Sequence, residues 1–129
     1  MKRSHKKLKA EIESYGLYSK WDRESRELPK IIEFTTHIEG KADNEFGMVL
    51  RILKGKGASI KYCIKHPPFK DNEGNIEPDF TGEYLVTSND YRFYIGDCIW
   101  EPVEDKKGIW EILVYYIDEI VASKKFDVR

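Results

Sequence analysis

The chain has 129 residues, enough for one domain with a single hydrophobic core. Hydrophobic residues make up 40% of it and charged residues 35%, while 22 basic and 23 acidic groups nearly cancel to a net charge of −1. This balance argues against a strongly basic nucleic-acid-binding protein and against an acidic disordered segment. No apolar run approaches the roughly 20 residues of a membrane-spanning helix, so we expect no membrane span.

The first nine residues form a basic segment with five Lys or Arg and no acid, so the remaining 120 residues carry −6. We predict that residues 1–9 are flexible and that residues 10–129 form the folded domain. A secretory signal would continue with an apolar stretch, whereas this chain continues with Glu11 and Glu13. We therefore expect a cytoplasmic protein, or a periplasmic or exported one if an upstream signal has been removed.

Apolar and polar residues alternate along most of the chain, which is typical of β-strands with one buried face. In one such segment Phe46, Met48 and Leu50 share a face. The first segment is also compatible with a short helix, but we favour a strand there. The pattern predicts about seven to nine strands, near residues 10–18, 31–39, 45–54, 58–66, 82–87, 91–100, 109–117 and 119–128.

Turn-forming residues separate the predicted strands, as at residues 55–57, 88–90 and 118–119. Gly96 interrupts the alternation, because the apolar residues before it are odd-numbered and those after it are even-numbered. A single extra residue reverses the phase of a strand, so we predict a β-bulge or a break at Gly96. We expect the same of Gly16 in the first strand.

Many short strands joined by turns predict an all-β protein, an antiparallel β-sandwich in a single domain. Two cysteines are too few for a disulfide framework. Both Cys63 and Cys98 lie in apolar segments, so we predict that both are buried, reduced thiols. Trp100 and Trp110 are expected to pack in the core of the sandwich.

Four short motifs resemble a known bacterial family: FGM at residues 46–48, IKHPP at 64–68, GIWEI at 108–112 and VASKKFDV at 121–128. They are similar to those of the domain of unknown function family 3859, and the resemblance covers Ile12 to Val128. It implies an immunoglobulin-like β-sandwich and no known activity. The usual Asp-Gly of that family's final turn is Asp118-Glu119 here.

The sequence holds no recognisable catalytic or metal-binding motif. Neither a C-x-x-C nor an H-x-x-x-H spacing occurs, and Cys63 and His66 would lie on opposite faces of a strand. The chain also has no G-x-S-x-G elbow and no glycine-rich phosphate loop. We therefore predict no catalytic residue, no metal and no cofactor.

Aromatic residues provide the candidate binding residues. Tyr18 and Trp21 lie in a polar segment, where aromatic rings can stack on sugars, bases or a partner's side chains. His66 ends a predicted strand and precedes the stiff segment Pro67-Pro68-Phe69, where it could contact a ligand or titrate near neutral pH. The candidates are thus Trp21, His66, Phe69 and Tyr18. For Trp21 we favour core packing over binding, and for His66 a hydrogen bond that fixes the loop.

These features predict a non-catalytic binding or protein-interaction module, with an unknown protein or small-molecule ligand and no nucleic acid. One alternative is an enzyme with a hydrolytic, metal-assisted site near His66 that uses carboxylates of the loop 67–79. Another is a structural protein that forms a homodimer through an edge strand such as 119–128.

Overall fold

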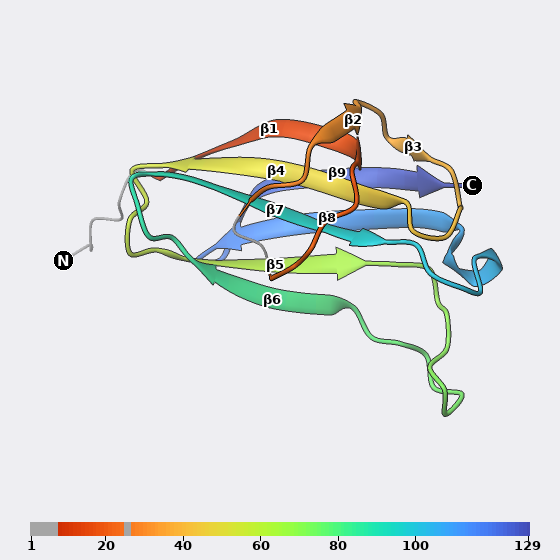
Figure 1. Ribbon diagram of the computed structural model, residues 1–129. Helices are drawn as coiled ribbons and strands as arrows, with labels where there is room; N and C mark the ends of the chain where they lie inside the picture. Colours follow the sequence, from red (N-terminus) through yellow and green to blue (C-terminus); the bar gives the residue numbers. More distant parts are fainter. Residues whose placement is uncertain (1–7, 25–26) are drawn as a thin grey trace.

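In the computed structural model, which describes residues 8–24 and 27–129, two β-sheets pack face to face (Figure 1). One sheet has four strands in the order β2-β1-β4-β7: β1 (Lys9–Tyr18), β2 (Ile31–Glu33), β4 (Glu45–Leu53) and β7 (Asp90–Cys98). The other has five in the order β3-β9-β8-β5-β6: β3 (His37–Ile38), β5 (Ser59–Lys65), β6 (Phe80–Leu85), β8 (Gly108–Tyr116) and β9 (Glu119–Val128).

Neighbouring strands are antiparallel except for β3 and β9, which run parallel. A short 3-10 turn, Glu104–Lys106, is the other regular element of the described residues. The predicted all-β sandwich is therefore confirmed. Among the described residues no helix is long and apolar enough to cross a bilayer. The predicted flexible segment 1–9 lies mostly outside the described residues.

The core lies between the two sheets and is formed by the predicted alternating faces. In β4, Phe46, Met48 and Leu50 are completely buried, and the Phe46 ring contacts Trp110 and Phe126 edge-on, with ring centres 5.3 and 5.5 Å away. Trp110 is in the core as predicted. Trp100 differs from the prediction, because 36% of it is exposed.

A second, smaller core lies on the outer face of the four-stranded sheet. The connection between β1 and β2 crosses this face in front of β4 and β7 (Figure 1). Tyr18, Val49 and Tyr94 are buried beneath it, and Trp21 and Leu28 of the connection pack against them. As a result β4 and β7 are buried on both faces, which explains the loss of simple alternation in the middle of β7.

The predicted strand 31–39 is wrong as a single element, because it divides into β2 and β3, which belong to opposite sheets. The chain crosses between the sheets at residues 34–36. The end of β2 and the start of this crossing pass so close to Gly16 that a Cβ atom at Gly16 would overlap the carbonyl oxygen of Glu33 and the backbone nitrogen of Thr35. A glycine is required by this close approach.

The predicted bulge at Gly96 is also wrong. The ladder between β4 and β7 runs without a shift from Glu45 opposite Cys98 to Leu53 opposite Asp90. Gly96 is instead the place where the Tyr94 ring folds back over the strand, in the space that a side chain would occupy. Gly16 likewise pairs in register with β4. The register shifts of β1 lie between Ile12 and Ser14 in the ladder with β4 and between Leu17 and Tyr18 in the ladder with β2.

The two cysteines are free, and each is partly rather than fully buried. The predicted edge strand β9 is paired with β3 only at its last two residues, Asp127 and Val128. The other edge of this sheet is β6, the lowest strand in Figure 1. Assembly of two copies through β9 stays a prediction.

Candidate functional site

Two hollows follow one another along the open side of the sandwich, where β6 and β7, the edge strands of the two sheets, face each other. The larger has a volume of about 470 Å³ and the smaller about 150 Å³. Both are lined by Trp21, Arg23, Tyr84 and Tyr94. We call the two hollows together the edge cleft. The larger also includes Leu28, Thr87, Tyr91, Arg92 and Phe93, and the smaller Tyr62, Ile95 and Gly96.

Trp21, a predicted binding residue, forms part of the wall of the edge cleft. Its indole N–H donates a hydrogen bond of 2.8 Å to the Glu27 carbonyl. Its ring meets Tyr94 edge-on at 4.9 Å, and the Arg23 guanidinium lies 5.1 Å from the centre of the ring. The ring is therefore fixed in position while it remains partly exposed, which suits a preformed aromatic contact.

The rim of the edge cleft is ion-paired. The two Nη atoms of Arg23 lie 3.2 and 3.1 Å from the Glu45 carboxylate, of which only 2% is exposed. The Tyr94 hydroxyl donates a hydrogen bond of 2.6 Å to the same carboxylate. Burial and the Glu45 charge raise the pKa of Tyr94, and burial raises the pKa of Asp97, which lies 4.0 Å from Arg23. The phenol is thus held neutral beside a paired charge.

Tyr84 joins the two edge strands across the cleft, because its hydroxyl donates a hydrogen bond of 3.1 Å to the Tyr94 carbonyl. Neither Tyr84 nor Tyr91 was expected at a site from the sequence. One feature of the sequence could have indicated that they share a site. The two aromatic residues lie on either side of the predicted turn at 88–90, which brings them near each other. Their distance from Trp21 depends on how the sheets pack, which no local pattern indicates.

Two other predicted binding residues lie in hydrophobic packing. Tyr18 is 2% exposed, accepts or donates a 2.7 Å hydrogen bond with Ser14, and has its pKa raised to about 12 by burial. Phe69 is 3% exposed and lies with Trp100 around the buried Lys106 ammonium, 4.8 and 4.6 Å from the two ring centres. Their contact with a ligand stays a prediction.

His66 follows the last residue of β5, where the long 67–79 loop begins. Its ring stacks on Phe69 at 4.3 Å. Its Nδ1 is 2.7 Å from the Pro67 carbonyl oxygen and its Nε2 is 2.8 Å from that of Pro78. The two ring nitrogens thus contact carbonyl oxygens at opposite ends of the loop. His66 therefore links the two ends, as expected of a histidine that fixes the loop.

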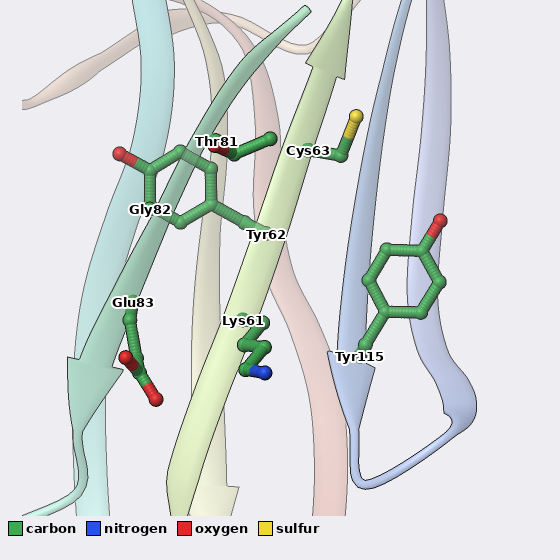
Figure 2. Close-up of a pocket in the computed structure, with 7 residues that line it drawn as sticks. All are labelled: Lys61, Tyr62, Cys63, Thr81, Gly82, Glu83 and Tyr115. Carbon is green, nitrogen blue, oxygen red and sulfur yellow. The ribbon is translucent and has the colours of Figure 1, made fainter.

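A third hollow of about 400 Å³ lies on the outer face of β5, β6 and β8 (Figure 2). Lys61, Cys63, Glu83 and Tyr115 point into it. We call it the outer hollow. Burial and the Asp79 carboxylate, 3.7 Å from the sulfur, raise the pKa of the Cys63 thiol. The thiol is therefore kept protonated, which disfavours nucleophilic chemistry there.

The described residues contain no group of three or more His, Cys, Asp or Glu side chains that could hold a metal ion. The metal-assisted alternative near His66 therefore gains no support from the geometry. The edge cleft, with fixed aromatic walls and a paired rim, is the arrangement best suited to reversible binding.

Two solved structures are similar to this chain. An immunoglobulin-like protein from Pseudomonas aeruginosa matches with a TM-score of 0.74 and 22% identity, over 94% of this chain and 97% of that one. The alkylpurine DNA glycosylase AlkC of Pseudomonas fluorescens, bound to DNA containing an abasic site analog, matches with a TM-score of 0.52 and 11% identity, over 98% of this chain and 31% of that one. These likenesses concern the fold, and the first confirms the immunoglobulin-like sandwich.

A comparison with curated proteins finds no match. The family model described as Domain of unknown function (DUF3859) matches residues 6–128, which is nearly the whole chain, with the motifs at 46–48, 64–68 and 108–112 inside it. The chain therefore belongs to the DUF3859 family.

Proposed function

We propose that this protein is a non-catalytic binding module whose ligand occupies the edge cleft. The observation that carries the proposal is the cleft itself, about 470 Å³ in its larger part and lined by Trp21, Tyr84 and Tyr91. Ligand sites are commonly concave, largely preformed and lined by aromatic side chains, with few polar groups to fix orientation. Arg23 and Arg92 supply those polar groups at the rim.

The ion pairs around the cleft argue against a nucleic-acid groove. Arg23 is paired with Glu45, and Arg92 Nε lies 2.9 and 3.1 Å from the Glu13 carboxylate oxygens. A groove that follows a phosphate backbone needs cations that are not neutralised by the protein's own acids. The ligand we propose is therefore a protein segment or a small molecule with apolar surface.

A thermal-shift panel of peptides, glycans and nucleotides tests the proposal. A ligand at about 100 times its Kd adds ~2.7 kcal/mol to the free energy of unfolding, a rise in Tm of about 10 °C for a domain of this size. A panel in which no compound raises Tm would contradict the proposal.

The Trp21→Ala variant tests whether the ligand binds in the edge cleft. Loss of a central aromatic contact is expected to weaken binding at least about tenfold. Phe34→Ala is the matched control, because Phe34 is 58% exposed and packs edge-on against Tyr15 at the opposite margin of the four-stranded sheet. Equal losses in the two variants would show that the ligand does not occupy the edge cleft.

A further inference from the structure

We infer that the partner is an extended segment of another polypeptide, which adds as a strand to the free edge of β6 and inserts alternate side chains into the edge cleft. This inference rests on the proposed function and names the chemistry of the ligand. Strand addition is a general mode of peptide recognition, in which backbone hydrogen bonds provide affinity and side-chain pockets provide specificity.

The hydrogen bonds at the end of β6 establish which backbone groups are free. The Val86 N–H donates to the Ala58 carbonyl, and the Val86 carbonyl accepts from Gly57, so both polar groups of Val86 point toward β5. In a strand these directions alternate from residue to residue. The backbone groups of Gly82 and Tyr84 therefore also face β5, and those of Thr81, Glu83 and Leu85 face outward, where Figure 1 shows no further strand.

The facing edge of β7 is closed by the protein's own side chains. The Tyr94 carbonyl accepts a hydrogen bond from the Tyr84 hydroxyl at 3.1 Å. Two residues further along, the Gly96 carbonyl lies 3.4 Å from Arg23 Nη2. A partner strand would have to displace both contacts to pair with β7, whereas β6 needs no such displacement.

The free edge of β6 also lacks the lysines, prolines and bulges that protect many edges from pairing, and its one charged side chain is Glu83. Natural edge strands are blunted by Lys, Pro or bulges, and the partly unpaired β9 carries Lys124 and Lys125. β6 has neither Lys nor Pro, and its pairing with β5 has no shift. This difference between two edges of one sheet favours β6 as the edge that accepts a partner.

Residues of β6 line hollows on both faces of the sheet, which could give specificity for the side chains of an added strand. Side chains of a strand point alternately to the two faces of the sheet. Those that point inward would enter the edge cleft on either side of Tyr84, which lines both of its hollows. Those that point outward would lie beside Thr81 and Glu83, which form the β6 margin of the outer hollow (Figure 2).

The shape and lining of the edge cleft indicate the kind of segment. It follows β7 from Tyr91 to Gly96, about 20 Å at 3.3 Å per residue, which fits a single extended chain. The smaller hollow, about 150 Å³ between Tyr62 and Trp21, suits an aliphatic side chain. The larger one suits an aromatic side chain two positions away. We therefore expect a segment with an aliphatic and an aromatic residue at positions i and i+2.

Selection from a phage-displayed library of random decapeptides provides the probe, and an enriched peptide is then synthesised. The decisive variant is Glu83→Pro, which removes one outward N–H and no hydrogen bond to β5. Glu83→Ala is its matched control, since both variants lose the contact between the Glu83 carboxylate and Ser59. We expect Glu83→Pro to bind the peptide about tenfold more weakly than Glu83→Ala.

In the unmodified protein, the peptide should slow hydrogen exchange of the amides of Thr81, Glu83 and Leu85. If Glu83→Pro does not fold, this measurement still tests whether the peptide adds to the edge of β6. Equal affinity of the two Glu83 variants, with binding still lost in Trp21→Ala, would overturn the strand addition and leave the proposed cleft standing. Failure to enrich any peptide, or a concentration-dependent dimer that Glu83→Pro abolishes, would also overturn it, the latter in favour of a second copy.

Discussion

The Arg23–Glu45 pair is the best place to test how the connection over the four-stranded sheet is held. Arg23 belongs to the connection between β1 and β2, whereas Glu45 is the first residue of β4 and is 2% exposed. Replacing Arg23 by Met keeps an apolar stem of similar length and removes the guanidinium. The Glu45 carboxylate then retains only the Tyr94 hydroxyl, 2.6 Å away, among the partners described above.

The size of the effect follows from the burial of the two partners. Removing one member of a fully buried pair costs about 3–5 kcal/mol, because the other charge is left unpaired. Here the Arg23 side chain is 45% exposed, so solvent already screens part of the interaction, and we expect a loss of about 2 kcal/mol. For a domain of this length that corresponds to a fall in Tm of about 8 °C.

Urea unfolding followed by circular dichroism measures the loss, with Arg92→Met as the matched control. Arg92 pairs with Glu13 and, at 3.4 Å, with Asp90, but all three side chains are at least 40% exposed, so the control should lose no more than about 0.5 kcal/mol. In the double variant Arg23→Met with Glu45→Gln, the losses should fall short of additivity by about 1 kcal/mol. Additive losses, or an Arg23→Met loss no larger than that of the control, would refute the reasoning.

Two further predictions concern β7. Burial raises the pKa of Asp97, so the folded state holds this proton more tightly than the unfolded chain, and stability is lost as pH rises from the ordinary Asp value near ~3.9 through the raised one. The stability of Asp97→Asn relative to the unmodified protein should therefore increase between about pH 3 and pH 7, and a constant difference in urea titrations at several pH values would contradict this. Gly96→Ala should cost about 3 kcal/mol, because its Cβ would overlap the Phe46 carbonyl oxygen and the Tyr94 hydroxyl. A change in Tm of less than about 2 °C would show that both the Tyr94 ring and the backbone of β4 move aside freely.

Local alternation was sufficient to predict most strands of the sandwich. The segments predicted at 45–54 and 119–128 correspond closely to β4 and β9, because a strand with one buried face carries its own period of two. The segment 31–39 has the same period, yet it contributes to both sheets. Membership of a sheet depends on which strand lies alongside, and in this case on the close passage of the chain past Gly16.

The candidate site was only partly predictable, for a related reason. Trp21 was predicted as a candidate binding residue because it is an aromatic residue in a polar segment, and it lies in the wall of the edge cleft. Tyr18, three residues earlier, shares that description but is buried. The different burial of Tyr18 and Trp21 results from the path of the β1–β2 connection, which crosses over the sheet (Figure 1). This connection is irregular, so the sequence has no periodicity that predicts its path.

Two glycines show how sequence and site are connected. Each lies in a strand, at Gly82 and Gly96, and each leaves room for a tyrosine ring: Tyr62 reaches across β6 at Gly82 (Figure 2), and Tyr94 folds over Gly96. Both rings line the smaller hollow of the edge cleft. An isolated glycine weakens a strand because it contributes no packing surface, and a ring laid over it restores that surface. The two glycines that interrupt the side-chain pattern of β6 and β7 therefore leave room for the aromatic wall on which the proposed recognition of a partner strand depends.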